Sequence, residues 1–324
     1  MDLETLKLRS QIIKETRNFF SEAGYIETDV PVLSSSLIPE TCLEVFKTEY
    51  IYPRENRKGE LYLVPSPEYY MKKLIARFKC SVFQISKCFR NLESRGRIHS
   101  PEFTMLEYYS VGKNYIDSIK ITEDLIFYLG KKLYGDNLPE IFRPPFLRIT
   151  VDGAFEKYLG FRLSDFQDFE SLKHKAESLD LMLNPETCTT WEEVYNLLFV
   201  NSVEPNLPED KIIFLMDYPA QVPCLAKNKN DFAKERWELY GRGIELANCY
   251  TEENDSKKVR DYFETETREK NKTAVVPHKV DNEYYKIFET FPETSGVAIG
   301  MDRLIALLLD KKTIEPVLPF PLEF

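Results

Sequence analysis

Strand-like and helix-like segments follow one another along this chain in an order that few fold classes allow. Apolar residues at spacings of three and four predict an amphipathic helix over residues 5–23, and strand-like segments separated by single helices follow it. The sequence shows no regular alternation of strand, helix and parallel strand. This order favours an α+β fold with a mainly antiparallel sheet.

The predicted elements cover most of the chain outside one middle segment. Strands are predicted over Tyr25–Val30, Leu61–Val64, Ser81–Cys88, Phe103–Tyr109, Ile212–Met216 and, around a glycine turn, Arg236–Leu246. Helices are predicted over Glu68–Phe78, Tyr115–Tyr134, Asp255–Lys272 and Asp302–Leu309. Residues 137–210 contain Pro144–Pro145 and helical stretches, and we interpret them as a helical, semi-independent insertion.

The charge balance limits the partners that the chain can take. Lysine and arginine number 43 against 53 aspartates and glutamates, a formal net charge of −10 at pH 7. Affinity for nucleic acid comes largely from basic side chains that neutralise phosphates, so this acidic total disfavours extensive RNA binding. It suits a cationic substrate or a basic protein partner.

The sequence also indicates a compartment. No apolar run approaches the roughly 20 residues of a membrane-spanning helix, and Met1–Ser10 lacks the apolar core of a signal peptide. The six cysteines are scattered without a CxxC pair, which argues against a zinc site or a disulfide framework. We therefore expect a cytoplasmic protein with no membrane partner.

A charged loop between two apolar strands is the first candidate site. The run Phe89–Phe103 contains three arginines, a histidine and a glycine. Arginine presents a rigid fork of donors that fits phosphate oxygens, so several arginines in one loop suit a polyphosphate. A solvated hairpin tip is the alternative. Neither GxxxxGK[ST] nor GxGxxG occurs in the chain, so a nucleotide site here must be of another kind.

Three glutamates seven residues apart, Glu238, Glu245 and Glu252, form the second candidate site. Glu245 lies between Ile244 and Leu246, where a carboxylate is costly unless it is paired or bound to a metal. Mg²⁺ prefers one or two carboxylates together with substrate phosphates, which fits Glu238 and Glu245. An edge strand with outward-facing acids is the alternative.

A glycine-bounded strand is the third candidate site. In Gly296–Leu304 an apolar strand delivers Arg303 to the start of an apolar helix. Gly300 permits a ligand to approach the backbone closely. A kinked strand whose Arg303 forms a surface ion pair is the alternative.

Together these segments resemble the signature motifs of class II aminoacyl-tRNA synthetases. Gly24–Pro31 and the helix before it look like motif 1 (about residues 10–31), the arginine loop with its strands like motif 2 (about 83–109), and the glycine-bounded strand with its helix like motif 3 (about 296–309). Ser66-Pro67-Glu68, residues 99–109 and Gly243–Asn248 are similar to the lysyl-tRNA synthetase branch. As a freestanding core, the chain resembles the elongation factor P–(R)-β-lysine ligases.

The resemblance implies an architecture. We expect one class II synthetase catalytic domain over residues 1–324, an antiparallel β-sheet flanked by helices, without an anticodon-binding domain. The family forms homodimers with motif 1 at the interface, so a homodimer is expected here.

The resemblance also implies how ATP and Mg²⁺ are bound. Arg90 would hold the α-phosphate and Arg303 the γ-phosphate, and both would act in catalysis. The loop is one residue longer than in some relatives, so Glu93 would read the adenine amino group. Glu238 and Glu245 would hold Mg²⁺. The other expected ATP contacts are Asn91, His99, Ser100, Glu245, Leu246 and Gly300.

For the amino acid, the resemblance implies a pocket with acids at both amino groups. Glu68 would take the amino group near the reacting carboxylate, and Glu252 with Tyr109 would receive the distal ammonium. Ser66, Pro67 and Ala298 complete the expected substrate contacts.

Three departures from the family pattern bear on these roles. Ser100 replaces a common asparagine, and Cys249-Tyr250 replaces a usual Gly-Phe in a way that would reshape the lysine pocket. Ala298 stands where lysyl-tRNA synthetases usually carry glycine. Its added methyl would disfavour α-lysine and suit a β-amino acid, an effect of about 1–3 kcal/mol at most.

The implied function is ATP-dependent activation of lysine or (R)-β-lysine to an adenylate and transfer to a lysine side chain of elongation factor P. A truncated lysyl-tRNA synthetase paralogue that charges tRNA is one alternative; the missing anticodon domain and the acidic charge argue against it. A non-catalytic synthetase-like regulator is another, although it would not need Arg90, Glu238, Glu245 and Arg303 together. An asparagine synthetase would need a cation where Glu252 stands.

Overall fold

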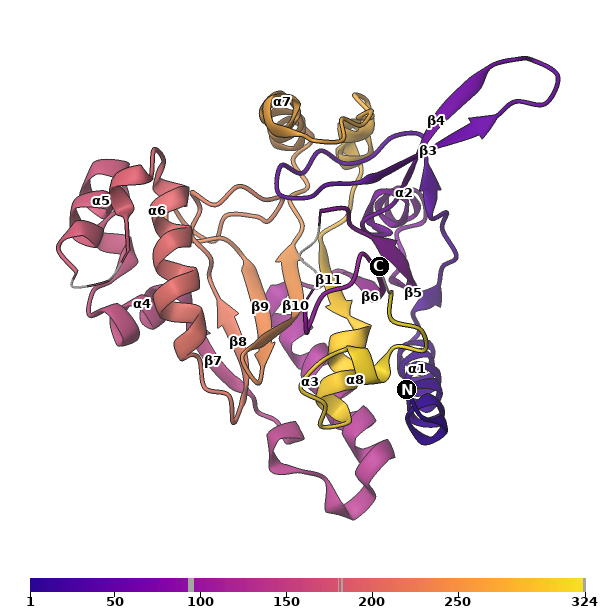
Figure 1. Cartoon of the computed structure of the whole chain (residues 1–324), viewed down its shortest axis with the longest axis horizontal. Helices are drawn as coiled ribbons and strands as arrows, with labels where there is room; N and C mark the ends of the chain where they lie inside the picture. Colours follow the sequence, from indigo (N-terminus) through magenta and orange to yellow (C-terminus); the bar gives the residue numbers. More distant parts are fainter. Residues whose placement is uncertain (93–95, 180, 182, 323–324) are drawn as a thin grey trace.

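A computed structural model describes residues 1–92, 96–179, 181 and 183–322, which fold around an eight-stranded sheet (Figure 1). From edge to edge its strands are β1 (Ile26–Glu27), β5 (Val82–Phe89), β6 (Glu102–Val111), β11 (Thr294–Gly300), β10 (Ile244–Thr251), β9 (Arg236–Gly241), β8 (Ile212–Met216) and β7 (Leu147–Thr150). Only the two outermost pairs are parallel. The predicted α+β fold with a mainly antiparallel sheet flanked by helices is therefore confirmed.

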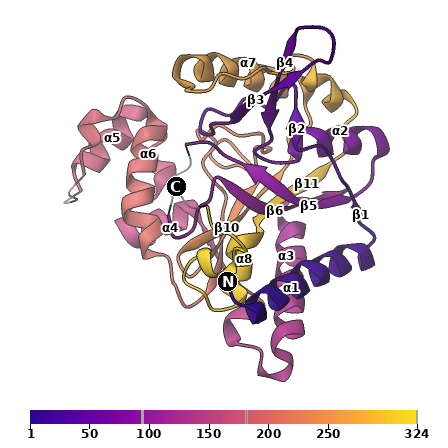
Figure 2. The same ribbon diagram turned by 45° about the vertical axis from the view of Figure 1, so that its right-hand side comes forward.

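Three helices cover one face of this sheet: α1 (Leu3–Glu22), α3 (Tyr115–Tyr134) and α8 (Met301–Leu308), which lie together below it in Figure 2. Phe20, Ile119 and Ile305 from these helices pack with strand residues such as Leu106 and Val297 into the largest hydrophobic core. Alternation along the strands leaves the neighbouring side chains on the opposite face, where the candidate site residues stand.

The opposite face is covered by α2 (Glu68–Phe78) and α7 (Ser256–Thr273) and by a small sheet of β2 (Leu33–Ser34), β4 (Lys58–Leu63) and β3 (Phe46–Ile51). Met71 of α2 and Phe263 of α7 meet in a core of their own with Tyr284. The β3–β4 hairpin extends away from the body (Figure 1). The sequence analysis did not predict β3, because this exposed strand has no apolar alternation.

From β7 onward the segment 137–210 lies at the β7–β8 end of the sheet, whereas residues 137–146 lie beside α3 and contribute Leu138, Phe142 and Phe146 to the largest core (Figure 1). Its helices α4 (Val151–Leu159), α5 (Phe169–Glu177) and α6 (Trp191–Leu198) share a core with Ile213 and Leu215 of β8. The segment also contributes β7, which is hydrogen-bonded to β8, so it is joined to the sheet by backbone pairing as well as by packing.

Predicted and observed boundaries agree where sequence signals are local. The helices over Glu68–Phe78 and Tyr115–Tyr134 and the strand Ile212–Met216 begin and end as predicted. The strand predicted over Tyr25–Val30 is only Ile26–Glu27, because the N–H of Val30 donates to Gln84 Oε1 in place of a backbone carbonyl. In the described part of the chain, none of the helices combines the length and the apolar character needed to cross a membrane.

Candidate active site

Two rows of side chains cross the middle of the main sheet and form the floor of a candidate active site. Leu106, Val297 and Cys249 of the central strands pack into the helix-covered core, so the residues next to them face the other side. Read across β6, β11, β10 and β9, one row is Glu107, Ala298, Asn248 and Glu238, and the next is Tyr109, Gly296, Tyr250 and Arg236.

Glu68, in the first turn of α2, and Glu252, just past β10, meet at one lysine. Lys72 Nζ lies 2.5 Å from Glu68 Oε1 and 2.6 Å from Glu252 Oε2, and the Lys72 side chain is 1% exposed. Lys72 follows Glu68 by one helical turn, so both stand on the same side of α2. The two carboxylates predicted to bind substrate ammonium groups thus share a buried cation of the protein itself.

Gly296 allows Glu252 and Tyr109 to come together over the floor. A Cβ at position 296 would overlap both the Glu252 carboxylate and the Tyr109 ring. The Tyr109 hydroxyl donates a hydrogen bond to Glu107. The structure therefore gathers the predicted residues Glu68, Glu252 and Tyr109 in one pocket, and their contacts with a substrate stay predictions.

Glu107 is a member of this pocket that the sequence analysis missed. Its side chain is buried, and its Oε2 has no hydrogen-bond partner among the described residues. Burial, reinforced by the charge of Glu68 and opposed by Lys72, raises the pKa of Glu107 to about 8. Burial also raises the pKa of Glu252 to about 7 against the effect of Lys72. Buried carboxyl groups of this kind are suited to accept an ammonium group.

Arg90 and Arg303 stand at the end of the floor where β10 begins. The Arg90 guanidinium lies over the Phe103 ring, 5.2 Å from Cζ to the ring centroid, and its Nε is buried without a hydrogen-bond partner in the described part of the chain. Arg303 donates from Nε to Ile98 O (3.1 Å) and from Nη1 to Glu245 O (2.7 Å). Two backbone carbonyls thus orient Arg303, and Arg90 keeps a buried donor for an anion.

The two predicted metal ligands differ in how much of each carboxylate is already used. Glu238 accepts hydrogen bonds from Tyr218 Oη (2.5 Å), Tyr240 Oη (2.9 Å) and Arg236 Nη2 (2.6 Å). Glu245 is more open: its side chain is 40% exposed, and its ion pair with Arg303 Nη1 is long, at 3.8 Å. Desolvation by neighbouring atoms and the charge of Glu238 raise the pKa of Glu245 to about 7, against the charges of Arg303, Arg236 and Arg90.

The carboxylates of Glu238 and Glu245 fit Mg²⁺, but they are not equally available to it. A carboxylate offers about four lone-pair positions, and three donors already occupy Glu238, whereas Glu245 keeps nearly all of its own. Mg²⁺ needs only one or two carboxylates beside substrate phosphates, so Glu245 would be its main protein ligand and Glu238 a secondary one. Among residues 1–92, 96–179, 181 and 183–322 no group of three or more His, Cys, Asp or Glu side chains could hold a metal.

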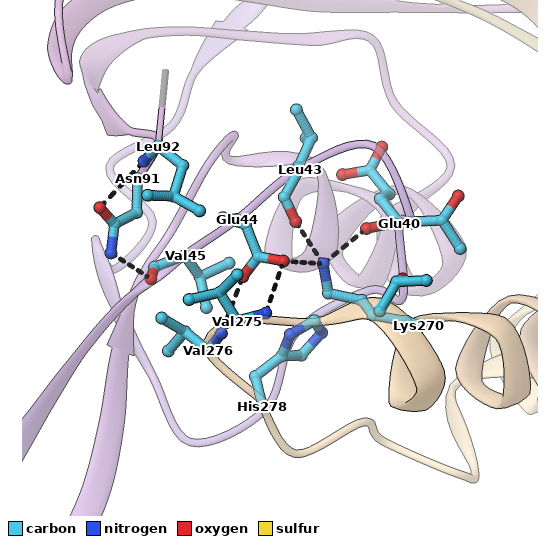
Figure 3. Close-up of polar contacts among 12 residues, drawn as sticks. Glu40, Leu43, Glu44, Val45, Asn91, Leu92, Lys270, Val275, Val276 and His278 are labelled. Carbon is cyan, nitrogen blue, oxygen red and sulfur yellow. Dashed lines mark hydrogen bonds and ion pairs between the residues drawn. The ribbon is translucent and has the colours of Figure 1, made fainter. Parts of the chain in front are cut away.

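The arginine loop supplies fewer described contacts than predicted. Glu93, the expected adenine reader, lies outside the described residues. Asn91 donates from Nδ2 to Val45 O (3.2 Å) and accepts from its neighbour's N–H, so its side chain serves the protein's own backbone (Figure 3). His99 forms a bridge with Gly96 that turns the loop back toward β6, and Ser100 follows it half-buried.

Figure 3 also shows how the loop between β2 and β3 is tied to α7 and to the arginine loop. Lys270 of α7 donates from Nζ to Glu40 O (2.8 Å). The Glu44 carboxylate accepts from the N–H groups of residues 275 and 276 (3.1 and 3.0 Å), and the Glu44 carbonyl accepts from Asn91 N (2.8 Å). These hydrogen bonds hold the β2–β3 loop against α7, the residues that follow α7, and the start of the arginine loop.

The remaining predicted site residues lie at the start of α2, at the junction of β11 and α8, and in β10. Pro67 is the N-cap of α2 and Ser66 precedes it, so these residues position Glu68. Gly300 joins β11 to α8 ahead of Arg303. Leu246 points into the helix-covered core, which leaves only its backbone to face a nucleotide.

The structure also places Ala298 and Cys249-Tyr250, the residues of the amino-acid site that depart from the family pattern. Ala298 stands in the floor between Glu107 and Asn248. Cys249 faces the core, with Sγ 3.4 Å from Ser295 Oγ, so only Tyr250 of the Cys249-Tyr250 pair lines the floor.

Comparison with known proteins identifies the class. The family model of class II tRNA synthetases (D, K and N) matches residues 2–323, and this protein belongs to that family. The predicted membership of the class II aminoacyl-tRNA synthetases is confirmed.

Similar proteins are more specific. The chain is 32% identical to the elongation factor P–(R)-β-lysine ligase of Proteus mirabilis (strain HI4320), over 98% of this chain and 95% of the relative. It is 35% identical to a homologue of that ligase from Aquifex aeolicus (strain VF5), over 96% and 98%, and 34% identical to the ligase of Buchnera aphidicola subsp. Baizongia pistaciae (strain Bp), over 99% and 96%.

Proposed function

We propose that this protein uses ATP to activate lysine or (R)-β-lysine as an adenylate and transfers the aminoacyl group to a lysine side chain of elongation factor P. The observation that carries the proposal is the carboxylate cluster of the buried Glu107 and Glu252 and the half-buried Glu68, with Arg90 and Arg303 at the far end of the same floor. Buried carboxylates accept the ammonium groups of a diamino acid, whereas arginines accept phosphate oxygens. The relatives named as elongation factor P ligases support the acceptor.

In the first step an oxygen of the substrate carboxylate attacks the α-phosphorus of ATP. The bond from that phosphorus to the bridging oxygen breaks, and pyrophosphate leaves. Arg90 donates to the α-phosphate, where negative charge develops, and Arg303 holds the terminal phosphate. Mg²⁺ bound to Glu245, with Glu238 beside it, would neutralise charge on the pyrophosphate.

In the second step the neutral ε-amine of the acceptor lysine attacks the carbonyl carbon of the adenylate. The bond from that carbon to the phosphate oxygen breaks, AMP leaves, and the attacking nitrogen releases a proton. No side chain has to bond covalently to the substrate, so the residues act by positioning and by electrostatics. The acidic pocket contributes by holding the amino groups of the substrate, and thereby its carboxylate, in one orientation.

We also propose a homodimer of single catalytic domains, formed through α1 and β1. β1 is an edge strand of two residues, and an open edge with apolar neighbours is commonly covered by another chain. Exposed apolar side chains on or beside these elements are Leu3, Leu6, Ile26, Val32 and Leu33.

Acceptor choice tests the proposed function. The purified protein is incubated with ATP, Mg²⁺ and radiolabelled lysine or (R)-β-lysine, together with either elongation factor P or total tRNA. We expect label on elongation factor P, lost when its acceptor lysine is replaced by arginine, and none above background on tRNA. Charged tRNA with unlabelled elongation factor P would overturn the acceptor and favour a truncated lysyl-tRNA synthetase.

A further inference from the structure

Lys72 is a fully buried cation at the centre of the acidic pocket, and the chemistry above does not use it. Its Nζ touches one carboxylate from its own helix, Glu68, and one from beyond β10, Glu252. It also stands 5.9 Å from the centroid of the Tyr109 ring. A buried ammonium group is stabilised in its charged form only by anions in contact with it. The Glu68 and Glu252 carboxylates provide these anions, and the lysine in turn stabilises their ionised forms.

We propose that Lys72 is a positioning residue for the amino-acid substrate, an inference that rests on the proposed function. Its ammonium group holds the Glu68 and Glu252 carboxylates on either side of one nitrogen and sets the charge of the pocket. Glu68, Glu107 and Glu252 bring three negative charges when ionised, and Lys72 cancels one. Two charges remain for the substrate, which matches the two ammonium groups of a diamino acid.

The charge count also explains why simpler amino acids would be rejected. A substrate with one ammonium group leaves one buried carboxylate without a cation, and a buried unpaired charge is strongly unfavourable. Glu40, whose pKa burial and the charge of Glu68 raise to about 7, also interacts with Lys72, but it has the two further cations of Arg90 and Lys270 beside it. The other titratable groups that interact with Lys72 or its two partners are Glu40 of the β2–β3 loop, Glu107 and Tyr109 of β6, Cys249 and Tyr250 of β10, and Tyr284.

The neighbouring lysine provides the contrast. Lys73 is half-buried, donates to the Tyr69 hydroxyl, and pairs with Asp281 at 3.0 Å. Lys73 carries the same charge as Lys72 and lies on the same helix, but it does not contact Glu68 or Glu252. Lys73→Met is therefore a matched control for Lys72→Met.

The pH profile of lysine activation distinguishes positioning from simple packing. The pKa values of Glu252 and Glu107 are raised to about 7 and about 8, so these groups ionise as pH rises, and kcat/KM for a cationic substrate should rise over that range. The charge of Lys72 lowers both pKa values; without it they move up. In Lys72→Met we expect the rise to move about one pH unit higher and kcat/KM for lysine at pH 7 to fall about tenfold.

The experiment measures ATP–pyrophosphate exchange with lysine and with (R)-β-lysine from pH 6 to about pH 9, the span of the raised carboxyl pKa values. Lys72→Arg, which keeps the charge, should restore the position of the profile, Lys73→Met should match the wild type, and KM for ATP should not change in any variant. A Lys72→Met profile that superimposes on the wild type would overturn the role of Lys72. Wild-type protein that exchanges with neither diamino acid would instead overturn the proposed function.

A second comparison covers the case in which Lys72→Met does not fold. Glu68→Gln/Lys72→Met removes one charge of each sign, so the remaining pocket is better balanced. It is compared with Glu68→Gln alone. Because the charge of Glu68 raises the pKa values of Glu107 and Glu252, Glu68→Gln alone should move the profile to lower pH, and the double variant should move it back toward higher pH. Identical profiles for the two variants would overturn the proposal.

Discussion

The two ends of the candidate site handle charge in opposite ways. At the acidic end, Glu68 and Glu252 lie 2.5 and 2.6 Å from the buried ammonium group of Lys72. At the other end, Arg303 is oriented by carbonyl oxygens, and Arg90 keeps an unpaired buried donor among the described residues. The acidic end is therefore preorganised by its own counter-ion, whereas the arginine end depends on the charge of a ligand.

This contrast implies that the arginines should carry the largest effects on the reaction. We expect Arg90→Ala and Arg303→Ala each to lower kcat for adenylate formation by at least about 10²–10³, the usual loss when one donor to a developing charge is removed. Circular dichroism checks that the fold is kept. Arg242, which pairs with Asp310 at the β9–β10 turn, offers a control: Arg242→Ala should leave pyrophosphate exchange unchanged. Exchange near the wild-type rate in either folded site variant would remove the assignment of the arginine end to ATP.

Loss of a negative charge at the acidic end should lower kcat/KM for the amino acid and leave KM for ATP unchanged. Glu252→Gln keeps the shape but removes the anion, so a buried ammonium group is left poorly paired, at a cost of about 2–5 kcal/mol. We expect this cost in kcat/KM for lysine, with KM for ATP preserved. Glu253→Gln is the matched control, because Glu253 points to Lys258 and to the start of α7 instead of the pocket. Lysine activation within about twofold of wild type in Glu252→Gln would show that this end does not bind the ammonium, since the expected loss is far larger.

The floor between the two ends should give the smallest effect. Ala298 projects one methyl group between Glu107 and Asn248, and a single methyl discriminates by about 1–3 kcal/mol at most. We expect Ala298→Gly to raise kcat/KM for α-lysine relative to (R)-β-lysine, with ATP use unchanged. Competition between the two amino acids in one exchange assay measures the ratio, and an unchanged ratio would exclude this methyl from the choice.

Two members of the acidic end, Glu107 and Lys72, were not predicted from the sequence, and the reasons differ. Arg90, Glu245 and Arg303 lie in segments whose local pattern is informative: an arginine loop, an acid between apolar residues, and a glycine-bounded strand. Glu107 carries the same kind of signal, as an acid inside an apolar strand, and could have been found from it. Lys72 could not, because the partner that buries it, Glu252, comes from a distant part of the chain.

The secondary structure likewise contains elements that the sequence predicts well and elements that it does not. Helices with local periodicity and clear ends, such as Tyr115–Tyr134 with its capping box at Asn114, were predicted to the residue. The strand β1 was overestimated, because a side chain of β5, Gln84, accepts the bond that would have continued it. The strand β7 was hidden inside a helical segment, and only its pairing with β8 reveals it. The end of β1 and the strand β7 thus depend on distant partners, whereas β3 was missed because it is exposed and lacks apolar alternation.

The most direct measurement is ATP–pyrophosphate exchange by the unmodified protein with four amino acids. Lysine and (R)-β-lysine carry two ammonium groups, norleucine lacks the distal one, and aspartate carries an anion in its place. A site with three carboxylates around one buried lysine should support exchange with the first two and none above background with the others. Exchange with norleucine or aspartate as fast as with lysine, or no exchange with either diamino acid, would contradict a site built for lysine-type substrates.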